Sequence, residues 1–530
     1  MSLPDPYTLP EARNWSIEDG RTLPEQSVLE ADVIIVGTGA GGGTAAELIA
    51  QAGYSVIMVE AGPLLHQKDF TMDEASLYPR LYQEGMSRTT RDGAISILQG
   101  RTVGGSTTVN WTSSFRTPDE TLRYWETLGV RDITPDSMRP FFEDREKRLN
   151  IRPWEVPPNR NNDLLRIGCE KLGWSWGTIP RNVKGCWDLG YCGMGCPTNA
   201  KQSMLVTTVP GALAQGARLL TNTQVEQVVW QGDQVTELVA MPQEPGTQTP
   251  VGHPIRLRGR HYILAASALG SPLILLKSKA PDPYGVLGKR TFLHPVNGIL
   301  ADMPEKTEPY YGAPQSIYSD EFVWRDGPTG KMGFKLEVPP LHPVLTAGVT
   351  GTHGNELTRW MKRLPHMHSV IALMRDGFHP DSPGGTVGIR KDGGPDLDYP
   401  LTDYLWEGIR EAWLRMGEAA FAAGARRVRP IHLSARDYRS WPEYRDAILS
   451  LPMRAHQARL FTAHQMGGCT MGEDPKRSVV NSYGRHHQLG NLSVMDASVF
   501  PTSLGANPQL TVYALAARNT RQLLRELGSA

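Results

Sequence analysis

A glycine-rich turn between two short apolar runs constrains the N-terminal part of this chain more than any other feature. Residues 32–36 form an apolar run typical of a buried parallel strand, and residues 55–59 form a second such run. Between them lie the turn, 37–42, and a segment of helical composition, 43–52. This order predicts one βαβ unit of about thirty residues.

The turn has the pattern Gly-x-Gly-x-x-Gly, which is typical of a dinucleotide site when it joins a strand to a helix. Gly37 makes the tight turn, Gly39 lets the backbone approach a pyrophosphate, and Gly42 packs the helix against the strand. The helix N-terminus offers unpaired N–H groups to the phosphate charge. Glu60 ends the second strand, where its carboxylate can accept hydrogen bonds from the adenosine ribose. The pattern favours nucleotide binding over a plain glycine turn, but it does not separate FAD from NAD.

Length and net charge limit the remaining possibilities. A chain of 530 residues exceeds one comfortable core, so two domains are expected. Lys and Arg together number 55, as do Asp and Glu, and this balance favours neither nucleic acid nor anionic lipid as a partner. We therefore expect an enzyme-sized globular protein that acts on a small molecule and has no nucleic-acid partner.

The expected location is the cytoplasm. The first residues lack the basic and apolar regions of a signal peptide, and the longest apolar stretch, 262–276, is too short and too interrupted to span a bilayer. Five cysteines without a secretory signal fit a reducing compartment better than a disulfide framework. A peripheral position on a membrane, or export with a signal-bearing partner, stays open.

Composition divides the chain into a nucleotide-binding domain and a second domain. Residues 1–30 are rich in proline and polar residues and are expected to form an arm over the surface. Residues 299–455 lack a βαβ rhythm and contain many Pro, Trp, Tyr and Met residues, so we assign them to a substrate-binding domain. The nucleotide-binding domain is then discontinuous, comprising 31–298 and 456–530. Within it, residues 158–201, rich in Gly, Cys and Asn, are expected to form a loop or lid.

The predicted fold class is α/β, with a Rossmann-like domain joined to a mostly antiparallel sheet that helices cover. The helical stretch 404–423, with Gly424 as a helix stop, would cover that sheet. Further strands are expected at 219–229 and 256–264, and residues 508–527 are expected to form a final helix.

Motifs far from the first glycine turn lead to a family resemblance. A second glycine block occupies 100–110, and a largely apolar segment that contains Gly270 and Pro272 occupies 265–276. The remaining motifs are Asn222-Thr-Gln-Val225, Leu492-Ser-Val-Met-Asp496, Thr462-Ala-His464-Gln-Met-Gly-Gly-Cys469 and Gly505-Ala-Asn507-Pro-Gln-Leu-Thr511. Together they resemble the glucose–methanol–choline (GMC) family of flavoprotein oxidoreductases over most of the chain. The C-terminal part resembles the bacterial cholesterol oxidase branch most closely.

The resemblance implies that the nucleotide is FAD. The first glycine turn would bind its ADP half, and the second glycine block would lie against the flavin, where a flat ring leaves no space for Cβ atoms. Val225 would meet the adenine through its backbone, and Asp496 would lie near the ribityl chain. A final helix opening at Pro508 would direct its positive end at the flavin pyrimidine. The implied cofactor-binding residues are Gly37, Gly39, Gly42, Glu60, Gly104, Gly105, Ser106, Asn110, Val225, Asp496, Ala497, Pro508 and Thr511.

The family's reaction also implies a catalytic pair, His464 and Asn507. Alcohol oxidation requires removal of the hydroxyl proton and transfer of the carbon-bound hydride to flavin N5, so the protein must handle the proton and stabilise the alkoxide. A histidine suits this task because its ordinary pKa lies near working pH. Whether His464 acts as a base or only orients the alcohol is not decided by the sequence. His294 is expected to pack against the pocket wall, and His486 and His487 to be solvated in a turn.

Three closely spaced cysteines, Cys186, Cys192 and Cys196, leave two alternatives open. Three thiolates without a fourth suit a three-iron cluster, and Cys-Pro ends many ferredoxin-like runs. Sugar dehydrogenases of this family, which hold a [3Fe–4S] cluster beside FAD, resemble this segment. Members that resemble long-chain alcohol oxidases have similar runs that are not associated with a cluster. The other alternative is a glycine-rich lid with reduced thiols, since zinc would need a fourth ligand.

The leading functional hypothesis is an FAD-dependent alcohol dehydrogenase or oxidase. The uncharged composition and the Trp-, Met- and Tyr-rich region 300–455 favour an apolar pocket, and hence an aliphatic or otherwise hydrophobic alcohol as substrate. A sugar or polyol dehydrogenase with an iron–sulfur cluster is the second hypothesis. Hypotheses of other classes are a flavin-bound non-redox lyase and an NAD-dependent dehydrogenase. The electron acceptor, whether oxygen, a quinone or an electron-transfer protein, is not indicated.

Overall fold

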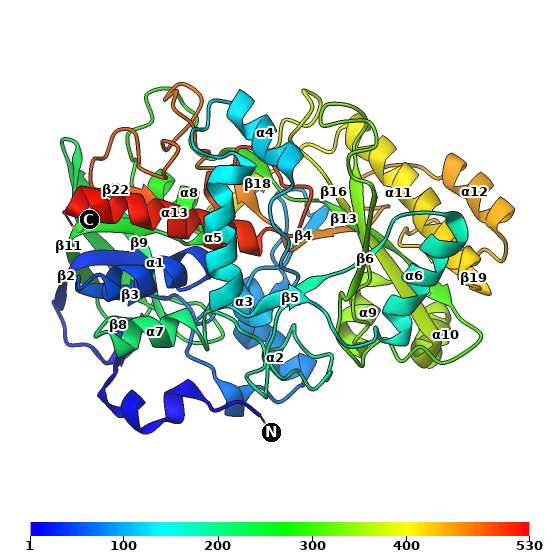
Figure 1. Cartoon of the computed structure of the whole chain (residues 1–530), viewed down its shortest axis with the longest axis horizontal. Coiled ribbons are helices and arrows are strands. Elements are labelled where there is room, and N and C mark those ends of the chain that lie inside the picture. The colour runs from blue at the N-terminus through cyan, green and yellow to red at the C-terminus, as the bar shows by residue number, and fades with distance from the viewer. Residues whose placement is uncertain (1, 529–530) are drawn as a thin grey trace.

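The computed structural model describes residues 2–528, and its N-terminal half is built on a mostly parallel sheet with helices packed on it (Figure 1). The strands follow the order β1–β8–β3–β2–β11–β10–β9, and β22 pairs with β11. β2 runs parallel to both β3 and β11, whereas β10 runs antiparallel to both of its neighbours. The strands of this first sheet are β1 Ser16–Asp19, β2 Val28–Val36, β3 Val56–Val59, β8 Arg218–Thr221, β9 Thr223–Gln231, β10 Gln234–Pro242, β11 Ile255–Leu264 and β22 Leu492–Val494.

The predicted βαβ unit is confirmed. Strands β2 and β3 pair in register from Val33 with Val56 to Val36 with Val59, and all of these side chains are buried. The helix between them, α1 (Ala40–Gln51), begins inside the glycine motif. Apolar side chains on both faces of the strands explain the burial, because a parallel sheet is covered on both sides.

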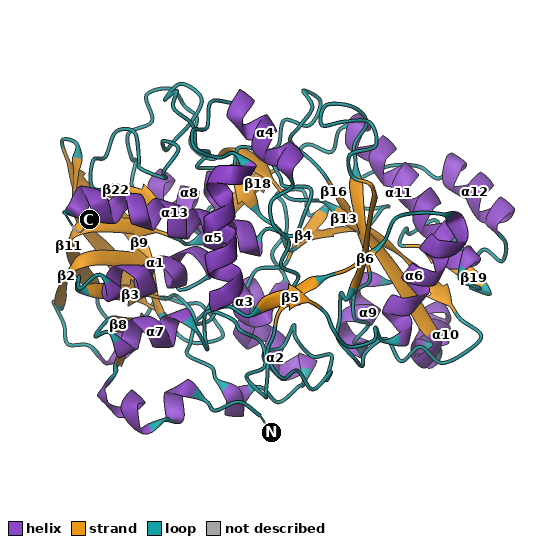
Figure 2. Cartoon of the chain, in the orientation of Figure 1, coloured by secondary structure: helices purple, strands orange, loops and turns teal. Residues whose placement is uncertain are grey.

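The helices cover the sheets and connect them (Figure 2). In chain order they are α1 Ala40–Gln51, α2 Glu74–Leu81, α3 Ser106–Val109, α4 Asp119–Thr127, α5 Pro135–Arg148, α6 Arg160–Leu172, α7 Thr208–Ala214, α8 Ser267–Lys277, α9 Pro343–Val349, α10 Gly354–Lys362, α11 Asp403–Ala422, α12 Trp441–Ser450 and α13 Gln509–Leu527. The final helix α13 packs against both α1 and α5. In residues 2–528, no helix combines the length and the apolar sequence that a bilayer crossing requires.

The second sheet is antiparallel except where β20 pairs with β4. Its order is β4–β20–β13–β16–β15–β14–β6, and β19 also pairs with β13. The strands are β4 Ile95–Ile97, β6 Gly177–Thr178, β13 Val296–Asp302, β14 Ile317–Phe322, β15 Phe334–Glu337, β16 Met367–Met374, β19 Arg427–Pro430 and β20 Leu460–Thr462. Helix α11 covers this sheet with a buried stripe formed by Ile409, Trp413, Met416 and Ala420. The predicted α/β fold class is therefore confirmed.

Two small pieces complete the strand pattern. A smaller sheet has the order β18–β17–β12–β21, and its strands are β12 Lys289–Phe292, β17 Gly385–Ile389, β18 Pro395–Asp398 and β21 Met466–Gly467. A separate ribbon pairs β5 Ile151–Pro153 with β7 Pro180–Asn182. The smaller sheet matters for the site because β12 and β21 pair antiparallel, Phe292 facing Met466. Segments that are distant in the sequence are thereby held side by side.

The expected loop or lid over 158–201 is wrong in its first third, which forms helix α6. The Asn159 side chain accepts a hydrogen bond from Asn162 N (2.9 Å), and Gly173 ends the helix in the left-handed conformation at φ +69°. Both are ordinary helix signals. The residues that suggested a loop, Gly and Cys, are concentrated after position 185.

The N-terminal arm makes a strand of its own. Residues 16–19 form β1, which pairs parallel with β8 at one edge of the first sheet. The expected strand over 219–229 is divided between β8 and β9 by Asn222, whose φ is +50°. A positive φ at a non-glycine residue interrupts the extended backbone, and the two strands have different partners: β8 pairs with β1 and β3, whereas β9 pairs with β10. The domain boundaries themselves stay a prediction.

Candidate active site

A cavity of about 1020 Å³ is lined from both halves of the molecule. The catalytic candidates His464 and Asn507 both line it. So do ten of the residues predicted to bind the cofactor: Gly37, Gly39, Glu60, Gly105, Ser106, Asn110, Val225, Asp496, Ala497 and Pro508. The other three, Gly42, Gly104 and Thr511, lie behind this lining. The sequence motifs from both ends of the chain thus meet at one cavity.

The two glycine blocks pack directly on each other. A Cβ on Gly105 would lie 2.8 Å from Gly39 Cα, and Gly105 itself has a φ of +54°. Gly104 N donates a hydrogen bond to Thr38 Oγ1 (2.9 Å). Gly42 packs against Gly37, where a Cβ would meet the carbonyl oxygen at 1.9 Å. Glycine is needed here because no side chain fits between two backbones at this separation.

Glu60 lies at the end of β3, facing the cavity. Its Oε2 accepts from Thr38 N (3.1 Å) and Thr38 Oγ1 (2.7 Å), and its Oε1 accepts from Gly62 N (2.9 Å). Burial raises the pKa of this carboxyl, while these hydrogen bonds and the nearby Arg101 favour its ionised form. The Nε and Nη2 atoms of Arg101 are buried without a hydrogen-bond partner. Glu60 is therefore a fixed acceptor at the cavity, and Arg101, outside the lining, has unused donors nearby.

Two helix N-termini end at the cavity without a side-chain cap. Helix α1 begins after Gly39 and α13 begins after Pro508, and neither flanking residue caps the helix. The first N–H groups of a helix have no partner inside it, and the helix dipole makes that end positive. Two uncapped helix N-termini can bind a pyrophosphate, and two glycine blocks without side chains at the contact leave room for a flat ring. Both features fit a dinucleotide. The residues present are therefore compatible with FAD.

Asp496 uses its carboxylate to hold the floor of the cavity. Its Oδ2 accepts from Ser267 N (2.9 Å) and Ser271 Oγ (2.6 Å), and its Oδ1 accepts from Ser498 N (2.8 Å). Burial raises its pKa, and the hydrogen bonds oppose that shift. The carboxylate thus fixes the start of α8 against the turn at 497–499. Thr511, in contrast, directs its hydroxyl to Thr117 (2.8 Å), outside the cavity lining.

His464 meets a second histidine that the sequence analysis assigned to packing. His294 Nδ1 lies 3.3 Å from His464 Nδ1, and the ring planes are inclined by 76°. The pairing of β12 with β21 explains the contact, because His294 lies two residues after Phe292 and His464 two residues before its partner Met466. Burial lowers the pKa of His464 to about 4 and that of His294 well below its ordinary value. Both rings are therefore neutral at neutral pH.

Asn507 is bonded to a buried carboxyl that the sequence analysis did not identify. Asn507 Nδ2 donates to Glu337 Oε2 (3.2 Å), and Gln315 Nε2 donates to the same oxygen (2.5 Å). Asn507 Oδ1 and Glu337 Oε1 are buried without partners. Burial raises the pKa of Glu337 to about 7, against the opposing effect of Lys335. The sequence does contain one signal for this buried carboxyl, namely the charged residues at 335 and 337. They occupy alternate positions of the short strand β15 and therefore lie on the same face of it.

One wall of the cavity is apolar. Val296, Ile371, Leu373 and Phe461 form a cluster contributed by β13, β16 and β20, and all four line the cavity. These strands present alternate side chains to the two faces of the second sheet, so one face reaches the cavity. An apolar wall beside a histidine and an amide is suited to a ligand that has both a carbon chain and a polar end.

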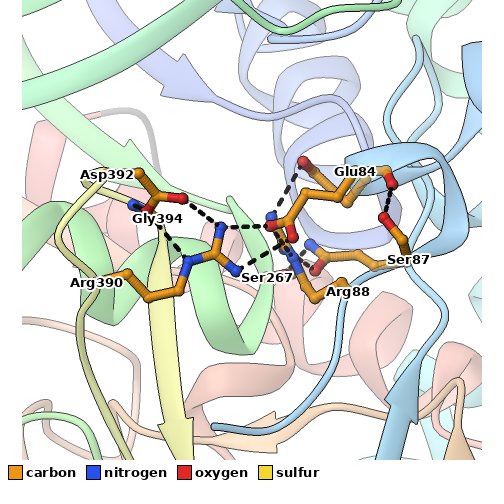
Figure 3. A network of polar contacts seen from close by, with 9 residues as sticks. Glu84, Ser87, Arg88, Ser267, Arg390, Asp392 and Gly394 are labelled. Carbon is orange, nitrogen blue, oxygen red and sulfur yellow. Dashed lines mark hydrogen bonds and ion pairs between the residues drawn. The ribbon is translucent and has the colours of Figure 1, made fainter. Parts of the chain in front are cut away.

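Charged residues border another part of the cavity (Figure 3). Arg390 Nη1 and Nη2 each donate to the Glu84 carboxylate (3.2 Å), and Arg88 Nε donates to Glu84 Oε1 (2.9 Å). Arg88 Nη1 then donates to Gln99 Oε1 (2.8 Å), and Gln99 Nε2 donates to Ser267 Oγ (2.5 Å). We call this network, formed by Glu84, Arg88, Gln99 and Arg390, the charged rim. It joins the turn after β17 to the segment that precedes β4. It continues to the floor because Ser267 is bonded to Asp496.

The three clustered cysteines lie outside the cavity lining and are free thiols. Lys201 lies beside them, and its Nζ donates to the carbonyl oxygens of Thr108 (2.8 Å), Asn110 (2.7 Å) and Cys192 (2.6 Å). Within residues 2–528, no group of three or more His, Cys, Asp or Glu side chains has an arrangement that could hold a metal ion. The predicted iron–sulfur ligands Cys186, Cys192 and Cys196 therefore gain no support from the geometry.

One minor expectation about the histidines is wrong. His486, expected to be solvated, is only 5% exposed. Its Nδ1 accepts hydrogen bonds from Gln488 N and Leu489 N (3.2 Å each), so the ring closes a tight turn. A turn-like sequence did not reveal this because the burial comes from the packing of distant elements.

Solved structures share this fold over nearly the whole chain. A formate oxidase of Aspergillus oryzae aligns with a TM-score of 0.69 and 15% identity, covering 94% of this chain and 99% of the other. Pyridoxine 4-oxidase from Mesorbium loti aligns with a TM-score of 0.66 and 19% identity, covering 93% and 99%. At such identities the likeness establishes the fold alone.

Similarities in sequence establish the family. An uncharacterized GMC-type oxidoreductase of Sinorhizobium fredii is 28% identical over 95% of this chain and 96% of its own length. A long-chain-alcohol oxidase of Arabidopsis thaliana is 29% identical over 92% of this chain and 68% of its own length. The N-terminal and C-terminal family models of GMC oxidoreductases match residues 78–296 and 380–516. This chain belongs to the GMC oxidoreductase family.

Proposed function

We propose that this protein is an FAD-dependent oxidoreductase that converts an alcohol to the aldehyde or ketone. The observation that carries the proposal is the shared cavity, where His464 and Asn507 lie with the two glycine blocks and two uncapped helix N-termini. A pure binding site would have no need for a histidine and an amide beside a flavin. Membership of the GMC oxidoreductase family supports the same reaction class.

The residues proposed to hold FAD are supported by their positions around the cavity. Gly37, Gly39 and the start of α1 would bind the pyrophosphate, and Glu60 would be placed at the adenosine ribose. Gly105, Ser106 and the start of α13 would lie at the flavin end. When bound, FAD supplies the acceptor for the hydride that leaves the alcohol carbon.

His464 and Asn507 are the proposed catalytic residues. Their side chains line the cavity, so both can hydrogen-bond the substrate oxygen and hold the alcohol in one orientation. Orientation and stabilisation of developing charge are the protein's contributions to such a reaction. Glu337 accepts a hydrogen bond from the Asn507 amide and limits its rotation, and Gln315 donates to the same Glu337 oxygen.

A hydrophobic, aliphatic alcohol is the proposed substrate class. The apolar wall of Val296, Ile371, Leu373 and Phe461 supports this choice because it would exclude water from a carbon chain. Similarity to plant long-chain-alcohol oxidases, at 29% and 27% identity, supports it further. A relative at 25% identity, 6'''-hydroxyparomomycin C oxidase of Streptomyces lividus, acts by its name on a polar alcohol, so a sugar or polyol is the competing class.

A panel of alcohols tests the proposal. The purified FAD-loaded protein should oxidise medium- and long-chain aliphatic alcohols faster than sugars, measured with oxygen and with an artificial dye as alternative acceptors. Anaerobic mixing with the best alcohol should bleach the visible absorption of the flavin. An unbleached flavin together with cleavage of a hydroxynitrile would indicate the non-redox lyase instead. Release of NAD rather than FAD on denaturation would exclude the proposal.

Two further arms of this experiment address the acceptor and the cysteines. Turnover with oxygen alone would make the protein an oxidase, whereas turnover only with the dye would point to a quinone or an electron-transfer protein. Iron and acid-labile sulfide analysis of anaerobically purified protein tests the [3Fe–4S] alternative. Stoichiometric iron and sulfide with preferential oxidation of sugars would replace the aliphatic-alcohol proposal.

A further inference from the structure

We propose that His294 is a positioning residue that holds His464 in the tautomer with its proton on Nε2. His464 then presents an N–H group, rather than a lone pair, to the oxygen of the substrate. This inference rests on the proposed function for the identity of the substrate. The tautomer itself follows from contacts within the protein.

The first step fixes the proton on His294. Its Nε2 accepts hydrogen bonds from two backbone N–H groups, those of Leu504 (3.2 Å) and Gly505 (3.0 Å). A ring nitrogen that accepts a hydrogen bond carries no proton, and a neutral imidazole has its single proton on the other nitrogen. The ring is neutral because burial disfavours its charge, as do the nearby His464, Lys335 and Arg375. The proton of His294 is therefore on Nδ1.

The second step transfers this constraint to His464. The protonated Nδ1 of His294 lies 3.3 Å from Nδ1 of His464, so it donates and the His464 nitrogen accepts. A neutral His464 must then carry its own proton on Nε2. No hydrogen bond from the described residues 2–528 reaches that Nε2, and the ring lines the cavity. The free N–H group is thus available to a ligand.

The surroundings hold the two rings in this arrangement. His294 has a left-handed φ of +43°, a conformation that persists only where neighbouring groups impose it. Its backbone N and that of Leu293 donate to the Asp376 carboxylate (3.1 and 2.9 Å). Thr462 Oγ1 donates to the Leu293 carbonyl and accepts from His464 N (3.0 Å). The same threonine therefore ties both histidine segments together.

The chemical consequence concerns the part that His464 plays in alcohol oxidation. With Nε2 already protonated, this ring cannot remove the hydroxyl proton. It donates a hydrogen bond to the oxygen and stabilises the negative charge that develops there as the hydride leaves. The hydroxyl proton is released to water, so the alcohol loses one hydride to FAD and one proton to solvent.

Nitrogen NMR of the FAD-loaded protein labelled with ¹⁵N-histidine tests the inference without substrate. The His464 signals, identified by their loss in His464→Gln, should show a protonated Nε2 and an unprotonated Nδ1 at neutral pH. His294, identified in the same way with His294→Gln, should show the opposite pattern. The variant His368→Gln, which replaces another buried histidine, should leave both sets of signals unchanged. A protonated Nδ1 on His464 in the unmodified protein would overturn the proposal.

Variants of His294 supply the kinetic test. His294→Phe keeps the ring shape without a donor, so the two tautomers of His464 should mix and kcat should fall by roughly tenfold or more, with KM changed by less than about twofold. In His294→Asn the amide can still donate to His464 Nδ1, and most of the lost kcat should return. Equal losses in the two variants would contradict the positioning role. If the NMR pattern is as expected but no alcohol is oxidised, the proposed function fails and the tautomer assignment stands.

Discussion

Glu337 shows how burial changes the chemistry of a single side chain. Its carboxyl is fully buried, and one oxygen accepts from two amide groups while the other has no partner. An isolated carboxylate would be costly in this position, so burial raises its pKa to about 7. The group is thus close to its titration point under ordinary conditions, next to a proposed catalytic amide.

This shift predicts a pH dependence of stability. The folded pKa of Glu337, about 7, lies above its ordinary value of 4.5, so the folded state favours the protonated form. The associated stability is fully present below the lower value and is lost as the pH rises through the higher one. Glu337→Gln should remove a decline on the order of 2–3 kcal/mol between pH of about 4.5 and about 7.5, measured by denaturation. The exposed Glu155→Gln should retain the full decline, and an unchanged decline in Glu337→Gln would contradict the assignment.

His464 gives a second prediction at the residue scale. His464→Ala should retain FAD, because the residue lies outside the glycine blocks, while turnover falls by about 10²–10³, the size typical of losing a donor that stabilises a developing negative charge. Flavin absorbance and steady-state rates measure the two effects. His253→Ala, at an exposed histidine outside the cavity lining, should change neither. Full activity in His464→Ala would end the catalytic assignment.

At the scale of elements, the contact between the two glycine blocks is the part of the site that tolerates least change. A Cβ at Gly105 would meet backbone rather than a flexible side chain, so the loop at 100–106 would have to move away from the start of α1. The same movement would widen the separation between the backbones of Gly39 and Gly105, where FAD is proposed to bind. The two glycine blocks are therefore coupled through direct backbone contact.

Gly105→Ala should consequently reduce FAD occupancy, measured by the ratio of flavin to protein absorbance. Gly53→Ala is the matched control, because Gly53 also has a positive φ (+87°) but open space around the added methyl group. The control should lose about 1 kcal/mol of stability and keep its FAD. Equal FAD contents in the two variants would show that the contact between the blocks has no role in binding.

At the scale of the whole molecule, the charged rim joins segments far apart in the chain. Arg390 follows β17, whereas Glu84 precedes β4, and their ion pair lies at the border of the cavity (Figure 3). Both side chains are partly exposed, so the pair contributes less than about 1 kcal/mol and weakens in salt. Its effect is therefore expected on access to the cavity more than on overall stability.

Arg390→Gln should accelerate FAD release at low salt by about two- to fivefold, the change that an ion pair of this strength supports. The rate is measured as the appearance of free flavin fluorescence after dilution. Arg91→Gln removes a comparable arginine that pairs with Asp396 and Asp398 but does not line the cavity, and it should release FAD at the original rate. Acceleration of the same size in both variants would mean that the rim has no special role.

The sequence predicted those parts of the molecule whose signal is local. The βαβ unit, α11 and α13 follow from apolar periodicity and glycine positions that a short window contains. The second sheet, in contrast, takes strands from 95–97, 177–178 and 460–462, and pairing between such distant segments leaves no local pattern.

The same limit applies to the site. His464 and Asn507 were identified from motifs and line the cavity, but the contacts of His294, Glu337 and Gln315 were not identified. His294 follows β12 of the smaller sheet, Gln315 precedes β14 and Glu337 lies in β15, and only the tertiary pairing of strands brings them to the motif residues. A motif search finds residues within the motifs, whereas the partners that these residues contact depend on the fold.

Strand β22 (492–494) and helix α13 (509–527) come late in the chain. They nevertheless complete the first sheet and its helical cover, which are otherwise formed by earlier residues. Gly41, in the first turn of α1, packs against the carbonyl of Met495. When only the first glycine turn has been translated, the backbone against which α1 packs has therefore not yet been synthesised. Flavin loading must then follow translation of nearly the whole chain. Protein halted before this point during synthesis would be expected to emerge colourless.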